Sequence, residues 1–265
     1  MTENTKNTKN TENTENVQNT ENVQNYSKHI FISYGDDKFI ASKKRIKKEA
    51  IDYGFDIVNV YGPEDLSDDF KRKVQAVLSF PKGGGYWIWK SYIFKKTMDE
   101  ANYNDVIVYC DCGSTIQPKT HDRYNEYVNM LSNSEHPILS FQLKQPNPTF
   151  AWTKTDVLDY FNITPKNPIY YSIQLIGGIL MMIKTPFTEQ LINDYYNLAI
   201  TRQDLFADGQ TQPNHPGFID HRHDQSIFSI LRMMYGCVIV EDNTSYQRDF
   251  KIFKSEPFLA TRHRC

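Results

Sequence analysis

The sequence contains no apolar run long enough to cross a membrane and no secretory signal at its start. A membrane-spanning helix needs about 20 apolar residues, and the longest candidate, Ile173–Ile183, is far shorter. Cysteine is also scarce, and of the four only Cys110 and Cys112 lie close together. Because no second pair stands at the spacing of a zinc site, we interpret the cysteines as free thiols. We therefore expect a cytoplasmic protein without a transmembrane segment.

The chain also lacks an excess of charge of either sign. Its formal net charge is -2, from 30 Lys and Arg against 32 Asp and Glu. A surface that binds nucleic acid needs a cationic excess, so nucleic acid is not an expected partner. Aromatic residues are plentiful at 14%. They suit the stacking of sugars and bases, but we expect most of them in the core.

The N-terminal segment has almost no apolar side chains. From Thr2 to Asn25 it repeats polar triplets such as TEN, TKN and VQN. A segment of this composition buries too little apolar surface to offset the entropy lost on ordering. We therefore predict a disordered, dispensable tail on residues 1–25. Residues 26–265 remain for one folded domain, which is long enough to bury a core and shape a pocket.

Strand and helix patterns alternate along the first part of this domain. Runs of β-formers at Lys28–Gly35, Phe55–Gly62 and Asp105–Cys110 are separated by amphipathic helical patterns, one ending at Gly54 and one over Leu66–Leu78. This alternation predicts an α/β fold with a mostly parallel central sheet flanked by helices. Further strands are predicted at His136–Leu143, Tyr170–Thr185 and Cys237–Asp242, helices over Pro186–Ile200 and Asp224–Tyr235, and a long loop at Arg202–Asp220.

An acidic residue follows the third of these strands. The segment DVIVYCDCG (Asp105–Gly113) places Asp111 directly after a run of β-formers. In open α/β sheets, ligands bind beyond the carboxyl ends of the strands. An acid at that position can hold a divalent cation, and the cation can hold a diphosphate. The alternative, which this segment alone favours, is an ordinary turn that contains Asp and Gly.

Three further segments carry residues that suit a binding site. In PKGGGYWIWK (Pro81–Lys90), glycines permit close approach of the backbone to a ligand, and the aromatic and lysine side chains suit stacking and phosphate binding; a turn followed by core aromatics is the alternative. Gly177 and Gly178 interrupt an apolar strand, which indicates a bulge, a close backbone approach or tight helix packing. HRHDQS (His221–Ser226) suits a metal pair, or Asp224 is simply a helix-dipole partner.

In their order and spacing, these segments resemble the GT-A type of nucleotide-sugar glycosyltransferase. More narrowly, they resemble the family found in capsule and lipopolysaccharide clusters and in large DNA viruses. The resemblance runs roughly from Lys28 to the C-terminus. It implies a GT-A-like fold, with residues 26–265 as the catalytic domain. The segments that carry it are FPKGGGYWIWKSYI, YCDCG, WTKTDV, QLIGGILMMIKT and HRHDQSIFSIL.

The resemblance also implies an activity and a cofactor. A sugar would move from a nucleoside-diphosphate sugar, UDP- or GDP-linked, to a glycan or other hydroxyl acceptor, with Mn²⁺ or Mg²⁺ bound. Asp111 matches the first acid of the family's DXD metal motif, whose second acid is Gly113 here, and His263 matches a late histidine of the metal site. Asp224 matches the catalytic acid that faces the acceptor hydroxyl or the donor sugar. The implied donor-binding residues are Ser33, Tyr34, Lys90, Asp111, Gly177, Gly178 and Gln225.

Two other functions fit the same residues. A sugar- or nucleotide-binding module without turnover would account for the glycine at position 113 in place of an acid. A metal-dependent hydrolase would bring His221, His223 and Asp224 together on one ion, without Asp111.

Overall fold

The computed structural model describes Met1 and residues 27–144, 147–245 and 254–263 of the chain. Apart from Met1, the predicted tail on residues 1–25 lies outside the described residues, as does Cys265. The other three cysteines, Cys110, Cys112 and Cys237, are free thiols, as predicted. In the described part of the chain, none of the helices combines the length and apolar character of a membrane span.

A six-stranded mixed sheet forms the centre of the fold, with the strand order β2-β1-β3-β6-β5-β7. β1 pairs in parallel with β2 and β3, and β5 pairs in parallel with β7, whereas β6 runs antiparallel to β3 and β5. The predicted α/β fold with a mostly parallel central sheet is confirmed. The strands are β1 (His29–Tyr34), β2 (Ile57–Tyr61), β3 (Val106–Cys110), β5 (Ile138–Gln142), β6 (Leu175–Ile183) and β7 (Val238–Glu241), and a small second sheet joins β4 (Thr115–Ile116) to β8 (Phe258–Leu259).

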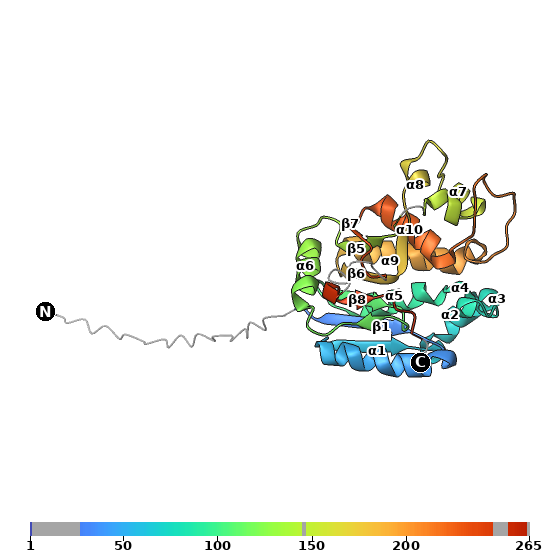
Figure 1. Ribbon diagram of the computed structural model, residues 1–265. Coiled ribbons are helices and arrows are strands. Elements are labelled where there is room, and N and C mark those ends of the chain that lie inside the picture. The colour runs from blue at the N-terminus through green and yellow to red at the C-terminus, as the bar shows by residue number, and fades with distance from the viewer. Residues whose placement is uncertain (2–26, 145–146, 246–253, 264–265) are drawn as a thin grey trace.

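Helices cover both faces of the central sheet (Figure 1). Alternate side chains of a strand point to opposite faces, so Ile30 and Ile32 of β1 belong to one apolar cluster and Phe31 to another. The first cluster packs against α5 (Trp89–Glu100), α9 (Pro186–Thr201) and α10 (His223–Tyr235), and the second against α1 (Ile40–Tyr53) and α6 (His121–Ser132). Because both faces are covered, β3 is buried along its whole length.

Short helical segments connect these layers. They are α2 (Asp68–Lys73), α3 (Gln75–Leu78), α4 (Gly83–Tyr86), α7 (Thr155–Tyr160), α8 (Pro168–Tyr171) and the 3₁₀ turns η1 (Asp37–Phe39), η2 (Pro63–Asp65), η3 (Thr149–Trp152) and η4 (Gln203–Leu205). The single helix predicted over Leu66–Leu78 is therefore wrong. Val74 leaves the helical conformation, at φ -116° and ψ 19°, and divides this segment into α2 and α3.

The segment predicted as an interrupted strand at Tyr170–Thr185 also differs. It begins in α8, and β6 then runs without a break through Gly177 and Gly178. The irregularity lies in the pairing of β5 with β6. Ser140 pairs with Leu180 but Gln142 pairs with Leu175, so the register shifts along the part of β6 that contains the two glycines. The bulge expected from the glycine pair is therefore a register shift that leaves the strand itself continuous.

Candidate active site

Asp111 follows β3, a strand with neighbours on both sides, at the carboxyl end of that strand. Its backbone N–H donates to the carbonyl of Gly178 on β6 at 2.8 Å. The antiparallel ladder thus continues one residue past Cys110, the last residue of β3, and fixes the backbone of Asp111. The side chain of Asp111 remains 48% exposed. This acid therefore stands at the sheet edge where α/β folds bind their ligands.

The two oxygens of the Asp111 carboxylate have different surroundings. Oδ1 accepts a hydrogen bond from the Tyr109 hydroxyl at 2.5 Å and lies 3.7 Å from Nζ of Lys90. Oδ2 faces Gly178, where a Cβ atom would stand only 2.7 Å from it. Burial, together with the nearby Asp111 charge, raises the pKa of Tyr109 well above its ordinary value, so the hydroxyl remains a donor.

The sequence pattern predicts Tyr109 only as a residue of the strand Asp105–Cys110. The available signal was its spacing, because residues i and i+2 of a strand lie on the same face.

Lys90, the second residue of α5, is only 2% exposed. Its Nζ atom donates to Oδ2 of Asp224 at 2.7 Å and to the carbonyl of Gly177 at 2.9 Å. Burial lowers the pKa of Lys90, but the negative charges of Asp224 and Asp111 outweigh that effect and the net shift is upward. The ammonium is therefore committed to protein partners, and it joins α5 to α10 and β6.

Asp224 lies in the first turn of α10 and is 4% exposed. Burial raises its pKa, and the Lys90 ammonium opposes that rise. We describe the pair as an ammonium and a carboxylate, because each charge stabilises the other at 2.7 Å. The site thus contains one buried and one half-exposed carboxylate on either side of a single cation.

The glycine pair of β6 has two separate packing roles. A Cβ atom on Gly177 would stand 3.0 Å from Cβ of Gln225, so Gly177 permits close packing of α10 on the sheet. The missing side chain of Gly178 makes room for the Asp111 carboxylate, because a Cβ atom there would stand 2.7 Å from Oδ2. Gln225 accepts a hydrogen bond from the Gly177 N–H at 3.1 Å and donates to Gln174 at 3.1 Å. Of the three interpretations of this motif, tight helix packing therefore applies to Gly177.

Ser33 and Tyr34 end β1 and are buried, at 0% and 7% exposure. The Tyr34 ring stacks on the Trp89 ring with centroids 3.8 Å apart. Among the described residues, the Ser33 hydroxyl has no hydrogen-bond partner. Their roles, and those of the other residues assigned to the donor, stay predictions.

The glycine-rich segment forms a left-handed turn. Five consecutive residues, Gly83–Trp87, have positive φ values between 52° and 91°. The N–H groups of Gly85 and Tyr86 bond to the carbonyls of Phe80 and Lys82 at 2.9 and 2.7 Å. A Cβ atom on Gly85 would stand 2.7 Å from Cα of Leu78. Here the glycines allow the left-handed backbone, and Gly85 also allows close packing on α3, as the alternative of a turn followed by core aromatics implies. A role of this segment in ligand binding stays a prediction.

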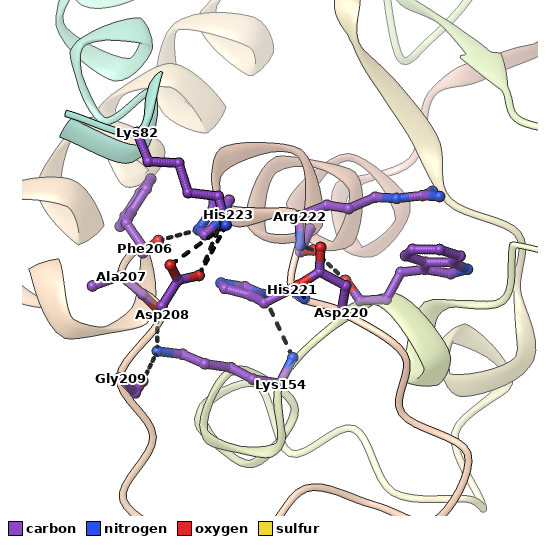
Figure 2. Close-up of polar contacts among 12 residues, drawn as sticks. Lys82, Lys154, Phe206, Ala207, Asp208, Gly209, Asp220, His221, Arg222 and His223 are labelled. Carbon is purple, nitrogen blue, oxygen red and sulfur yellow. Dashed lines mark hydrogen bonds and ion pairs between the residues drawn. The ribbon is translucent and has the colours of Figure 1, made fainter. Parts of the chain in front are cut away.

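The rings of His221 and His223 lie beside residues 205–208, which precede them in the segment between α9 and α10 (Figure 2). Nε2 of His221 bonds to the carbonyl of Leu205 at 2.9 Å, and Nδ1 of His223 bonds to the carbonyl of Phe206 at 2.8 Å. Asp224 pairs with Lys90 instead. Across the described residues, no three His, Cys, Asp or Glu side chains form a metal-binding group. The arrangement required by the hydrolase alternative is therefore not present in this part of the chain.

The C-terminal segment runs beside the turn that contains Asp111. The N–H of His263 donates to the carbonyl of Gly113 at 2.9 Å, and the His263 carbonyl accepts from the Ser42 hydroxyl of α1 at 3.0 Å. The fold thus brings a late histidine next to the turn that follows Asp111, with its side chain exposed. A Cβ atom on Gly113 would make ordinary contacts at 3.4 Å with Arg262 and His263.

Neither a protein-family model nor a curated protein matches this chain. Among solved structures, it is similar to a glycosyltransferase involved in glycosylation of the major capsid of PBCV-1, at 11% identity over 87% of this chain and 93% of the other, with a TM-score of 0.46. It is also similar to mouse xyloside xylosyltransferase 1, at 11% identity over 84% and 89% of the two chains, with a TM-score of 0.47.

A third similar structure is the galactosyltransferase LgtC in complex with donor and acceptor sugar analogues. Its identity to this chain is 12% over 88% of this chain and 79% of the other, with a TM-score of 0.40. All three are glycosyltransferases, the class that the sequence resembles.

Proposed function

We propose that this protein is a glycosyltransferase that moves a sugar from a nucleoside-diphosphate sugar to a glycan or other hydroxyl acceptor. The donor is UDP- or GDP-linked, and Mn²⁺ or Mg²⁺ is the cofactor. The observation that carries the proposal is the arrangement of Asp111 and Asp224 on either side of Lys90, at the carboxyl end of β3. A half-exposed acid suits cation and diphosphate binding, and a buried acid suits proton transfer or orientation of a hydroxyl.

The donor set at this edge fits a divalent cation that is shared with the substrate. Asp111 would supply a carboxylate oxygen, the ligand type that Mn²⁺ and Mg²⁺ prefer. The family resemblance implies that His263 would add an imidazole nitrogen. The Asp111 side chain is 48% exposed, and its Oδ2 atom lies against Gly178, which has no side chain. Such cations often take only one or two protein ligands and complete their coordination with substrate phosphates and water. When bound, the cation stabilises the negative charge of the leaving diphosphate.

Asp224 and Lys90 would have separate roles in the transfer step. Asp224 would accept a hydrogen bond or a proton from the attacking hydroxyl, or orient the donor sugar. Its upward pKa shift moves the carboxylate towards the pH at which general bases work best. Lys90 would act through the carboxylates it holds, because its ammonium already donates to Asp224 and to Gly177.

The test is a thermal-shift screen with UDP and GDP, each with and without Mn²⁺. A ligand that binds only the native state raises the melting temperature. We expect a shift with one nucleotide that requires Mn²⁺ and that Asp111→Ala removes. Release of the nucleotide from its sugar conjugates then separates an enzyme from a binding module, which would bind without turnover. Equal shifts in the wild-type protein and Asp111→Ala would contradict the proposed site.

A further inference from the structure

Tyr109 of β3 contacts the Asp111 carboxylate through its hydroxyl. Its side chain is completely buried among residues that contact α5 and α10, and its hydroxyl reaches Oδ1 of Asp111 at 2.5 Å. A hydrogen bond to a carboxylate is stronger than one between neutral groups. The hydroxyl therefore ties one oxygen of a half-exposed acid to the rigid centre of the sheet.

We propose that Tyr109 is a positioning residue that holds the half-exposed Asp111 side chain in the rotamer in which Oδ2 lies against Gly178. The inference rests on the proposed function, in which the Asp111 carboxylate holds the cation and, through it, the diphosphate. With Oδ1 engaged by Tyr109, Oδ2 is the oxygen that remains for a ligand. Gly178 completes the arrangement, since any side chain at that position would meet Oδ2.

The Tyr109 hydroxyl keeps the Asp111 carboxylate from pairing with the Lys90 ammonium. The Nζ atom of Lys90 is 3.7 Å from Oδ1 of Asp111, which is beyond hydrogen-bond distance. Without the hydroxyl, Coulomb attraction would favour a turn of the carboxylate towards the ammonium. Asp111 would then resemble Asp224, which is already paired with Lys90. Tyr109 thus keeps the two carboxylates in different roles.

Tyr195 provides a matched control for the loss of a tyrosine hydroxyl. It is also fully buried in the same apolar cluster, where its ring stacks on Phe228. Among the described residues, its hydroxyl has no hydrogen-bond partner. Removing that oxygen therefore tests the general effect of a buried Tyr→Phe change without touching Asp111.

The experiment is titration calorimetry of Mn²⁺ in the presence of UDP or GDP, on the wild-type protein, Tyr109→Phe and Tyr195→Phe. We expect about tenfold weaker Mn²⁺ affinity in Tyr109→Phe, the usual scale for groups that orient a metal ligand, and wild-type affinity in Tyr195→Phe. In turnover assays the KM for Mn²⁺ should rise while the KM for the acceptor stays constant. A purely structural role would lower the melting temperature and leave Mn²⁺ affinity unchanged.

Wild-type Mn²⁺ affinity in a folded Tyr109→Phe variant would overturn the inference and leave the proposed function intact. If the wild-type protein itself binds neither nucleotide in the presence of Mn²⁺, the proposed function fails first. Tyr109→Met is a second variant without the hydroxyl. The same loss of affinity is expected from it, and it replaces Tyr109→Phe if that variant does not fold.

Discussion

The ammonium of Lys90 donates to Oδ2 of Asp224 at 2.7 Å, and both side chains are almost completely buried, at 3% and 6% exposure. This contact joins α5 to α10 at the edge of the sheet where Asp111 stands. Two opposite charges can remain in such a place because each compensates the other. The pair therefore belongs both to the stability of the fold and to the proposed chemistry, and the two contributions can be separated by substitution.

Asp224→Asn should reduce sugar transfer much more than nucleotide binding. The amide keeps the shape of the side chain but cannot accept a proton, and general-base assistance is typically worth about 10²–10⁴-fold in rate. Mn²⁺-dependent binding of UDP or GDP should stay close to wild type, because Asp111 is unchanged. The measurement is kcat alongside calorimetric nucleotide affinity. Full transfer activity, or a loss confined to nucleotide affinity, would contradict the role given to Asp224.

Lys90→Met should destabilise the fold by about 3–5 kcal/mol, because it leaves the buried Asp224 carboxylate without a compensating charge. The matched control is Lys48→Met. It removes the exposed pair with Asp52, whose side chains are 76% and 60% exposed, and exposed pairs contribute at most about 1 kcal/mol. Urea unfolding of both variants measures the difference. Similar losses in the two variants would show that Asp224 relaxes towards solvent or becomes protonated at little cost.

The strands that position the site could be predicted because their side chains are buried on both faces. The run Val106–Cys110 is apolar without alternation, and the change to Asp111 marks the sheet edge. The placement of antiparallel β6 between β3 and β5 could not be predicted, since strand order depends on contacts between distant segments. The orientation of Tyr109 towards Asp111 depends on the same packing.

The glycine-rich segment and the histidine pair each have a sequence pattern that a binding role and a structural role explain equally well. Glycines at Gly83–Gly85 are required for positive φ and close contact with α3, and the same residue type would be required by a bound phosphate. His221 and His223 have a spacing that suits a metal, yet a ring nitrogen of each donates to a backbone carbonyl, that of Leu205 or Phe206. For each motif, a binding role and a structural role would use the same residue types at the same spacing. The contacts in the folded structure are needed to tell the two roles apart.

Gly178→Ala should weaken Mn²⁺-dependent nucleotide binding. The added Cβ would stand 2.7 Å from Oδ2 of Asp111, so the carboxylate must move or the strand must shift. The control is Gly209→Ala, because a Cβ atom there meets no atom of the described residues within 4 Å and Gly209 has no positive φ. Calorimetry with UDP or GDP and Mn²⁺ should show at least about tenfold weaker binding in Gly178→Ala alone. Equal affinity in the two variants would place the cation away from Oδ2.

His221→Gln should make the protein less sensitive to mild acid. Burial, and then the proximity of His223, lower the pKa of His221 to about 3, whereas in the unfolded chain it is about 6.5. Between these values the unfolded state binds more protons than the native state, so stability falls as the pH falls from 6.5 towards 3. At pH 5 the loss from this one group is about 2 kcal/mol.

Glutamine at position 221 can still donate to the Leu205 carbonyl, which Nε2 of His221 contacts at 2.9 Å, and it does not titrate. The free energy of unfolding, measured by urea at pH 7 and pH 5, should therefore fall by about 2 kcal/mol less in His221→Gln than in the wild-type protein. Other groups titrate in both proteins, so the difference between the two isolates His221. Parallel losses would mean that His221 becomes protonated in the native state and that the loop around Leu205 opens to accommodate the charge.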